Sequence, residues 1–255
     1  MYKQVIDALN KLRKKKSAND ADVEATVDNF DLIKSLLKFN DKGDFYFLQI
    51  ILRKKDGFND PGANRNNGYR TVKSYYIKSV AEFDNKRKEI TQLCNQNHAR
   101  AYINLNVRNM RNVLFSMSRE IPSLLEDEQY DKGFRVLEHC CGITPKKGIK
   151  KTWIVDVDTK DHEVGTVVKS AVNMCRSNNK VDDEHYDNIV AVVPTRAGWH
   201  LITVGFDKSK LKENITAEAD RVFGAARKER FSDEMIEEIC DSVKKDNPTL
   251  LYFKK

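Results

Sequence analysis

Short runs of apolar, β-branched and aromatic residues recur along this chain and alternate with stretches of helical periodicity. Such runs predict β-strands, because these side chains pack well on a pleated sheet. Amphipathic spacing between them predicts helices that bury one face against the sheets. The predicted strands are residues 45–52, 69–77, 101–107, 153–157, 189–193, 199–204 and 249–253. We therefore expect a mixed α/β protein.

Helical spacing is clearest between these strands. It predicts an amphipathic N-terminal helix over residues 2–16 and further helices over 30–37, 81–95, 113–125, 130–140 and 164–175, with at least one helix in the charged segment 207–245. Pro122 is expected to break the helix that contains it, because proline has no backbone N–H to donate. The first two strands are expected to pair as a hairpin across a long loop, 54–68, that is rich in glycine and asparagine.

Changes of composition divide the chain into four parts. Residues 1–43 form an N-terminal helical segment, and 44–141 form an N-terminal α/β unit. A basic, turn-rich connector, 142–151, separates this unit from residues 152–255, which begin with a strand that runs into acidic residues. We expect the connector to be the main internal boundary.

Composition narrows the class of protein. The apolar content of 40 % is enough for a sizeable core, and no apolar run approaches the roughly 20 residues that cross a bilayer. The five cysteines show no CxxC spacing, which favours neither a disulfide scaffold nor a zinc ribbon. Without a signal-peptide pattern, a cytoplasmic protein with no membrane partner is expected. The net charge of +7 leaves nucleic acid open as a partner.

Two carboxylates stand at the end of the predicted strand 153–157. Side chains alternate along a strand, so Asp156 and Asp158 are expected on the same face, a few ångströms apart. Carboxylates in this arrangement bind one or two Mg²⁺ or Mn²⁺ ions. The alternative is that the aspartates simply serve as turn or capping residues at the end of the strand.

A second candidate element is the segment 192–203. Two apolar runs flank Thr195, Arg196, Ala197 and Gly198, which predicts a hairpin whose turn presents Arg196 and whose second strand carries His200. Arg196 could hold a phosphate through two hydrogen bonds, and His200 could donate another. Considered alone, His200 beside Trp199 could equally be a half-buried histidine with a structural hydrogen bond.

Taken together, the Asp-x-Asp strand end, the following helix and the Thr-x-x-Gly-x-His hairpin resemble the first two motifs of the archaeo-eukaryotic primase superfamily. The resemblance covers about residues 152–207. It implies a core in which an N-terminal α/β unit precedes an RRM-like antiparallel sheet with flanking helices. It also implies that Asp156 and Asp158 bind the catalytic divalent metal, while His200, Arg196 and Thr195 contact the phosphates of a nucleoside triphosphate.

The family also uses a third acid on a later strand. Asp241 stands at a suitable distance before the last strand, and Asp207 and Asp220 are weaker candidates. Four arginines could contact nucleic acid, although solvated surface charge is the alternative for each: Arg53, Arg100, Arg108 and Arg111.

The sequence thus predicts an enzyme, a primase- or polymerase-like nucleotidyltransferase that acts on nucleic acid by two-metal catalysis. One alternative is a metal-dependent nuclease or phosphohydrolase, since paired acids with a nearby histidine also build such sites. Another is a non-catalytic nucleic-acid-binding or interaction protein with a primase-like fold. Neither a P-loop nor a GxGxxG pattern is present, which argues against ATPases and dinucleotide enzymes.

Overall fold

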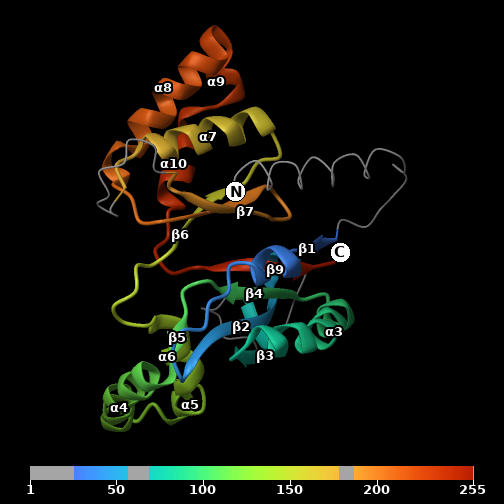
Figure 1. The fold of residues 1–255 in the computed structure, drawn as a ribbon, viewed down its shortest axis with the longest axis vertical. Coiled ribbons are helices and arrows are strands. Elements are labelled where there is room, and N and C mark those ends of the chain that lie inside the picture. Colours follow the sequence, from blue (N-terminus) through green and yellow to red (C-terminus); the bar gives the residue numbers. More distant parts are fainter. Residues whose placement is uncertain (1–25, 57–68, 178–186, 255) are drawn as a thin grey trace.

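The chain folds around two antiparallel β-sheets with helices packed on them, as a computed structural model shows (Figure 1). The structure describes residues 26–56, 69–177 and 187–254. The predicted helix over 2–16 and most of the predicted loop 54–68 lie outside the described residues. The mixed α/β class, with antiparallel sheets and flanking helices, is confirmed.

The first sheet has six strands. In order across the sheet these are β1 (Val27–Asp28), β9 (Pro248–Phe253), β4 (Arg100–Asn104), β2 (Asp44–Arg53) and β3 (Tyr69–Ile77), with β5 (Arg108–Asn109) paired to the start of β2. The predicted hairpin of β2 and β3 is confirmed, and its two strands pair from Tyr46 with Ile77 to Arg53 with Tyr69.

Helices cover part of each face of this sheet. On one face, α2 (Phe30–Lys34) and α3 (Val80–Asn97) bury Phe30, Phe83 and Ile90 against alternate residues of β2 and β3. On the other, α4 (Met110–Glu126), α5 (Tyr130–Gly133) and α6 (Val136–Ile143) form a smaller cluster with Phe45 and Phe47. β2 contributes buried side chains to the core clusters on both faces of the sheet, because its successive residues point to opposite sides.

The second sheet has three strands in the order β6 (Trp153–Val157), β8 (Trp199–Thr203) and β7 (Ile189–Pro194). Its helical face carries α7 (His162–Met174), α8 (Leu211–Phe223) and α10 (Asp233–Asp241), with the short α9 (Arg227–Arg230) between the last two (Figure 1). Val155, Val157 and Leu201 meet the apolar stripe of α7 in this core. Asp161 begins α7 as its N-cap by accepting hydrogen bonds from the backbone N–H groups of Glu163 and Val164.

The last strand does not stay with the C-terminal unit, as the 152–255 boundary implied. Instead β9 pairs with β4 and β1 in the first sheet. At the free edge of β6 there is only one bridge, in which Ile154 and Lys244 exchange backbone hydrogen bonds of 2.8 and 2.9 Å. The chain then leaves this edge, and β9 completes the six-stranded sheet.

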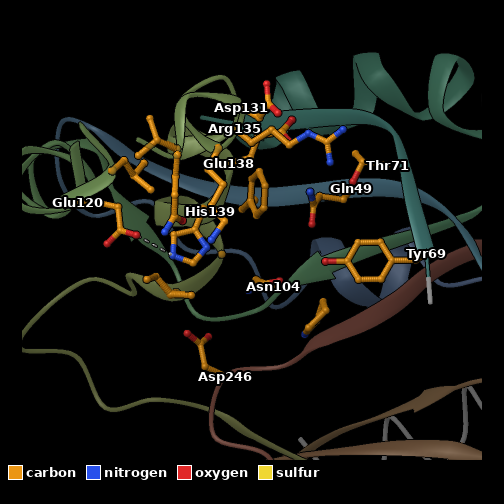
Figure 2. Close-up of a pocket in the computed structure, with 18 of the residues that line it drawn as sticks. Gln49, Tyr69, Thr71, Asn104, Glu120, Asp131, Arg135, Glu138, His139 and Asp246 are labelled. Carbon is orange, nitrogen blue, oxygen red and sulfur yellow. Dashed lines mark ion pairs between the residues drawn. The ribbon is translucent and has the colours of Figure 1, made fainter. Parts of the chain in front are cut away.

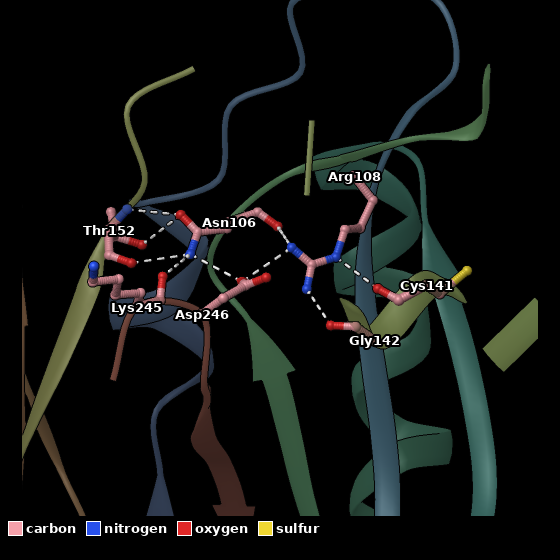
Figure 3. A network of polar contacts seen from close by, with 7 residues as sticks. All are labelled: Asn106, Arg108, Cys141, Gly142, Thr152, Lys245 and Asp246. Carbon is pink, nitrogen blue, oxygen red and sulfur yellow. Dashed lines mark hydrogen bonds and ion pairs between the residues drawn. The ribbon is translucent and has the colours of Figure 1, made fainter. Parts of the chain in front are cut away.

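A polar network ties together the two segments that connect the sheets (Figure 3). Asn106 accepts a hydrogen bond from the backbone N–H of Thr152, and its amide group donates to Asp246. Arg108, which is fully buried, donates to Asp246 and to the carbonyl oxygens of Asn106, Cys141 and Gly142. The segment 144–152 and the segment before β9 are thus held at one point, beside the end of β4.

Two helical predictions were wrong. Pro122 does not end its helix, since α4 continues to Glu126, held by Leu124 and Met117 packing beside Phe45. The helix predicted over 130–140 is two short helices, α5 and α6, and the second extends to Ile143. No helix within the described residues is long and apolar enough to cross a membrane.

Candidate functional site

Asp156 and His200 face each other on neighbouring strands. They are direct partners in the antiparallel register of β6 and β8, and Asp156 Oδ1 lies 3.4 Å from His200 Nε2. Asp158 follows the end of β6 on the same side, as alternation requires, and it is exposed. No hydrogen bond or ion pair from the Asp158 side chain to the rest of the described chain is present. The structure therefore brings together the two acids and the histidine that the sequence singled out.

A tight turn sets this alignment. Thr195 N–H donates to the carbonyl oxygen of Gly198 at 2.9 Å, and Gly198 N–H donates back to Thr195 Oγ1 at 3.0 Å. At Gly198 the backbone passes so close to the end of β6 that an added Cβ would lie 1.9 Å from the carbonyl oxygen of Val157. Only glycine fits there, so the turn and the Asp-x-Asp strand end fix each other's position. Thr195 closes the turn with its hydroxyl.

Trp199, the residue after Gly198, anchors the turn to the helices that cover the second sheet. The ring of Trp199 packs on α7 at Gly165, where a Cβ would lie 2.9 Å from the indole. On the other side of β6, Ser242 Oγ accepts a hydrogen bond from the backbone N–H of Asp156 and donates to its carbonyl oxygen, both at 3.0 Å. Both strands that carry the candidate site are thus held by side chains outside the sheet.

The electrostatics of the pair depend on burial. Burial, with the nearby charge of Asp158, raises the pKa of Asp156 to about 6, while Arg53 acts in the opposite direction. Burial lowers the pKa of His200 to about 4. At neutral pH the aspartate is therefore ionised and the imidazole is neutral, so their contact is not an ion pair. Asp156 Oδ1 is inaccessible to solvent and has no hydrogen-bond partner among the described residues.

His200 also joins the two sheets. Its Nδ1 lies 2.8 Å from Oγ1 of Thr249, a fully buried residue of β9. Because a neutral imidazole has one donor and one acceptor nitrogen, this contact settles the orientation of the ring and directs Nε2 toward Asp156. The expectation that His200 makes a structural hydrogen bond is thus met at Nδ1, while Nε2 faces the Asp156 carboxylate.

Three arginines gather beside the pair. Arg53 donates to the hydroxyl of Tyr102 at 2.9 Å and is close enough to act on the charge of Asp156. Arg100 and Arg196 both bind Asp56, which the sequence did not single out. Both guanidinium groups also lie over the ring of Phe253, 4.6 and 5.7 Å from its centroid. Arg53 thus supplies positive charge next to Asp156, while the charges of Arg100 and Arg196 face the Asp56 carboxylate.

Not every predicted residue belongs to this site. Arg100 is nearly buried in its pairing with Asp56, and Arg108 is fully buried in the network of Figure 3, so neither is a free contact for a phosphate. Each is buried because carboxylates and carbonyl oxygens surround its guanidinium. Arg111 is exposed on α4 over the ring of Phe115, in the layer of helices beneath the first sheet.

The third acid is not found. Asp241 is exposed at the last position of α10, and within the described ranges no group of three or more His, Cys, Asp or Glu side chains could hold a metal ion. Of the weaker candidates, Asp207 caps a short turn by accepting from Ser209 N–H, and Asp220 pairs with Arg227. Among the described residues Asp241 thus forms no metal-binding group with Asp156 and Asp158.

The donor set nevertheless suits a divalent cation. Hard cations prefer carboxylate oxygens, and Asp156 offers a buried oxygen that lacks a partner while Asp158 offers a free carboxylate. His200 would stand beside such an ion and any phosphate bound to it. Sequence reasoning missed Asp56 and Thr249, since nothing in the local pattern of either residue shows what it contacts across the sheets.

Comparison of the chain with protein-family models, with curated proteins and with solved structures gives no significant match.

Proposed function

We propose that this protein is a primase- or polymerase-like nucleotidyltransferase that uses Mg²⁺ or Mn²⁺, nucleoside triphosphates and nucleic acid. The observation that carries the proposal is the contact between Asp156 and His200. A carboxylate with an unpartnered buried oxygen and a neutral imidazole share one face of a sheet, and Asp158 lies beside them. This is the arrangement that the resemblance to archaeo-eukaryotic primases implies.

In this proposal each side chain has a separate task. Asp156 and Asp158 would hold two divalent cations, one of which would lower the pKa of the attacking 3′-hydroxyl while the other would stabilise the leaving pyrophosphate. His200, kept neutral by burial, donates a hydrogen bond from Nε2 to a phosphate oxygen. Arg196, at the turn, neutralises phosphate charge without giving up its contact with Asp56. Arg53 adds a positive charge next to the acids.

The order of binding follows from the charges. With both aspartates ionised, like charges repel and a polyanionic triphosphate is disfavoured. A cation on the two carboxylates reverses the local charge. The proposal therefore requires that nucleotide affinity depends on divalent metal, and that template affinity, carried by arginines, depends on it less.

The decisive experiment is an extension assay. The protein is incubated with Mn²⁺ or Mg²⁺, labelled deoxynucleoside triphosphates and primed or unprimed single-stranded DNA, beside an Asp156→Ala, Asp158→Ala double variant. Asp241→Ala is the matched control, because this aspartate is exposed at the end of α10 and is not among the charges that act on Asp156, so its loss should leave extension intact. Extension that is lost in the double variant alone supports the proposal.

Other results assign a different function. Shortening of the DNA that disappears in the double variant would make the protein a metal-dependent nuclease. DNA binding without extension or shortening, equal in all three proteins, would leave a non-catalytic nucleic-acid-binding protein and overturn the proposed activity.

A further inference from the structure

A large open pocket lies on the six-stranded sheet, away from the Asp156–His200 site. Its volume is about 850 Å³, within the range of small-molecule sites. Phe47 and Gln49 of β2, Tyr69 and Thr71 of β3 and Asn104 of β4 line one side of it (Figure 2). Residues of α4, α5 and α6 line the other side. Neither aspartate of the metal site contributes to this pocket.

The unusual residue in the pocket is Asn104, the last residue of β4. It is 6 % exposed, yet its side-chain amide has no hydrogen-bond partner among the described residues. An amide carries two N–H donors and one carbonyl acceptor. The Asn104 amide atoms are not among the buried side-chain polar atoms without a partner, so they are accessible from the pocket. Because Asn104 lines the pocket, a ligand there is the natural partner for these groups.

The neighbours of Asn104 indicate what kind of ligand fits. Gln49 pairs with Tyr102 in the register of β2 and β4, so Gln49 and Asn104 lie on the same face of the sheet. The Gln49 side chain donates to Ser74 Oγ at 3.3 Å, which leaves its carbonyl oxygen available. Tyr69 is 47 % exposed, and its ring borders the same space. Two amides and an exposed aromatic ring on a sheet face are the side chains that read and stack unpaired bases.

The charges around the opening favour an uncharged ring over a phosphate chain. Asp131 and Glu138 stand among Lys132 and Arg135, so both signs are mixed around the pocket (Figure 2). A polyphosphate would meet carboxylates more often than cations. A base edge with an adjacent donor and acceptor, in contrast, matches an amide through two hydrogen bonds.

We propose that this pocket binds a nucleobase, whose edge hydrogen-bonds to the Asn104 amide and whose face stacks on Tyr69. The base belongs either to a free nucleoside or to an unpaired nucleotide of a strand. The site is independent of the proposed catalysis, since it shares no residue with the metal site.

The test uses adenosine, an uncharged nucleoside, titrated by calorimetry into the full chain in the presence of a metal chelator. Asn104→Ala and, separately, Tyr69→Ala should each weaken binding by about tenfold, as the loss of a paired base edge or a stacking ring does. Gln92→Ala is the matched control, because Gln92 is exposed on α3, which packs on the opposite face of the sheet. Tyr69 is partly exposed, so its variant tests the site even where Asn104→Ala does not fold.

Two results would overturn the inference: adenosine, guanosine, cytidine and uridine all failing to bind the wild-type chain, or binding that neither variant alters. Loss of adenosine binding in the Asp156→Ala, Asp158→Ala double variant would also overturn it, because the nucleoside would then occupy the metal site. Retained binding in that variant keeps this inference separate from the proposed catalysis. A single-stranded oligodeoxyadenylate that displaces adenosine and binds more tightly identifies a strand as the source of the base; equal affinity identifies a free nucleoside.

Discussion

Asp156 and His200 are register partners on β6 and β8, and their pKa values move in opposite directions from a common cause. Burial raises the pKa of the carboxyl to about 6 and lowers that of the imidazole to about 4. Each group is thereby pushed toward its neutral form. Below pH 6 and above pH 4 the folded pair carries one proton, on the carboxyl, whereas in the unfolded chain that proton is on the imidazole.

This exchange of a proton predicts a specific pH dependence of stability. The pKa of the Asp156 carboxyl is raised from 3.8 to about 6 in the folded chain. Its contribution to the free energy of unfolding therefore decreases as the pH rises between these two values. The pKa of His200 is lowered from 6.5 to about 4 in the folded chain. Its contribution to the free energy of unfolding therefore decreases as the pH falls between these two values. In the wild-type chain the two trends oppose each other. Asp156→Asn should therefore lose stability on acidification from pH 6.5 to 4 more steeply than wild type, and His200→Gln less steeply.

Urea denaturation in chelator-containing buffers at several pH values in this interval measures both slopes. Variants that follow the wild-type curve would mean that the two pKa values are not shifted in the folded chain.

The turn glycine gives a second prediction. Gly198→Ala would place a methyl group 1.9 Å from the carbonyl oxygen of Val157, and backbone atoms cannot yield as a flexible side chain can. The strand end that carries Asp158 must then move, at a cost of about 3 kcal/mol or more in the free energy of unfolding. Gly133→Ala, with no atom within 4 Å of the added methyl group, should change stability by less than about 1 kcal/mol. Denaturant unfolding checks both, and equal stability of the two variants would contradict the close approach.

Local pattern was enough to predict the elements of the site. The apolar run at 153–157 predicted a strand, and the turn sequence Thr195 to Gly198 between two apolar runs predicted a hairpin; both are present. From these, period-two geometry put Asp156 and Asp158 on one face. The direct pairing of Asp156 with His200 depends on the register of β6 and β8, which no local pattern in either strand specifies.

Contacts between residues far apart in the chain could not be predicted in the same way. The run at 249–253 is apolar enough to pair in either sheet, and its place beside β4 depends on Ala101, Tyr252 and their neighbours, far apart in the chain. The burial of Arg108 is similar. Its acceptors include carbonyl oxygens of α6 and the Asp246 carboxylate, and an isolated arginine between Val107 and Asn109 carries no sign of them.

Arg108 gives a third prediction. Arg108→Met should lower the free energy of unfolding by about 3–5 kcal/mol, because it removes the cation paired with Asp246, which keeps the Asn106 amide, and takes the Arg108 donor away from several carbonyl oxygens. Arg111→Met, the exposed control on α4, should cost less than about 0.5 kcal/mol. Denaturant unfolding gives both values. A small effect at Arg108 would show that the network of Figure 3 does not hold the two connecting segments together.

The final prediction concerns divalent metal directly. If Asp156 and Asp158 hold a cation, Mn²⁺ stabilises the folded chain by about 2.7 kcal/mol at a free concentration of about 100 times Kd. The double variant Asp156→Asn, Asp158→Asn should lose this increment, while Asp241→Asn should retain it, since Asp241 is exposed at the end of α10 and is not among the charges that act on Asp156. Absolute stabilities are the wrong comparison, because removing a carboxyl whose pKa burial has raised stabilises the metal-free chain at neutral pH. The quantity to compare is the change that Mn²⁺ produces in each protein, measured by denaturant unfolding with and without chelator. An equal change in the wild type and the double variant would place the cation elsewhere and remove the basis of the proposed catalysis.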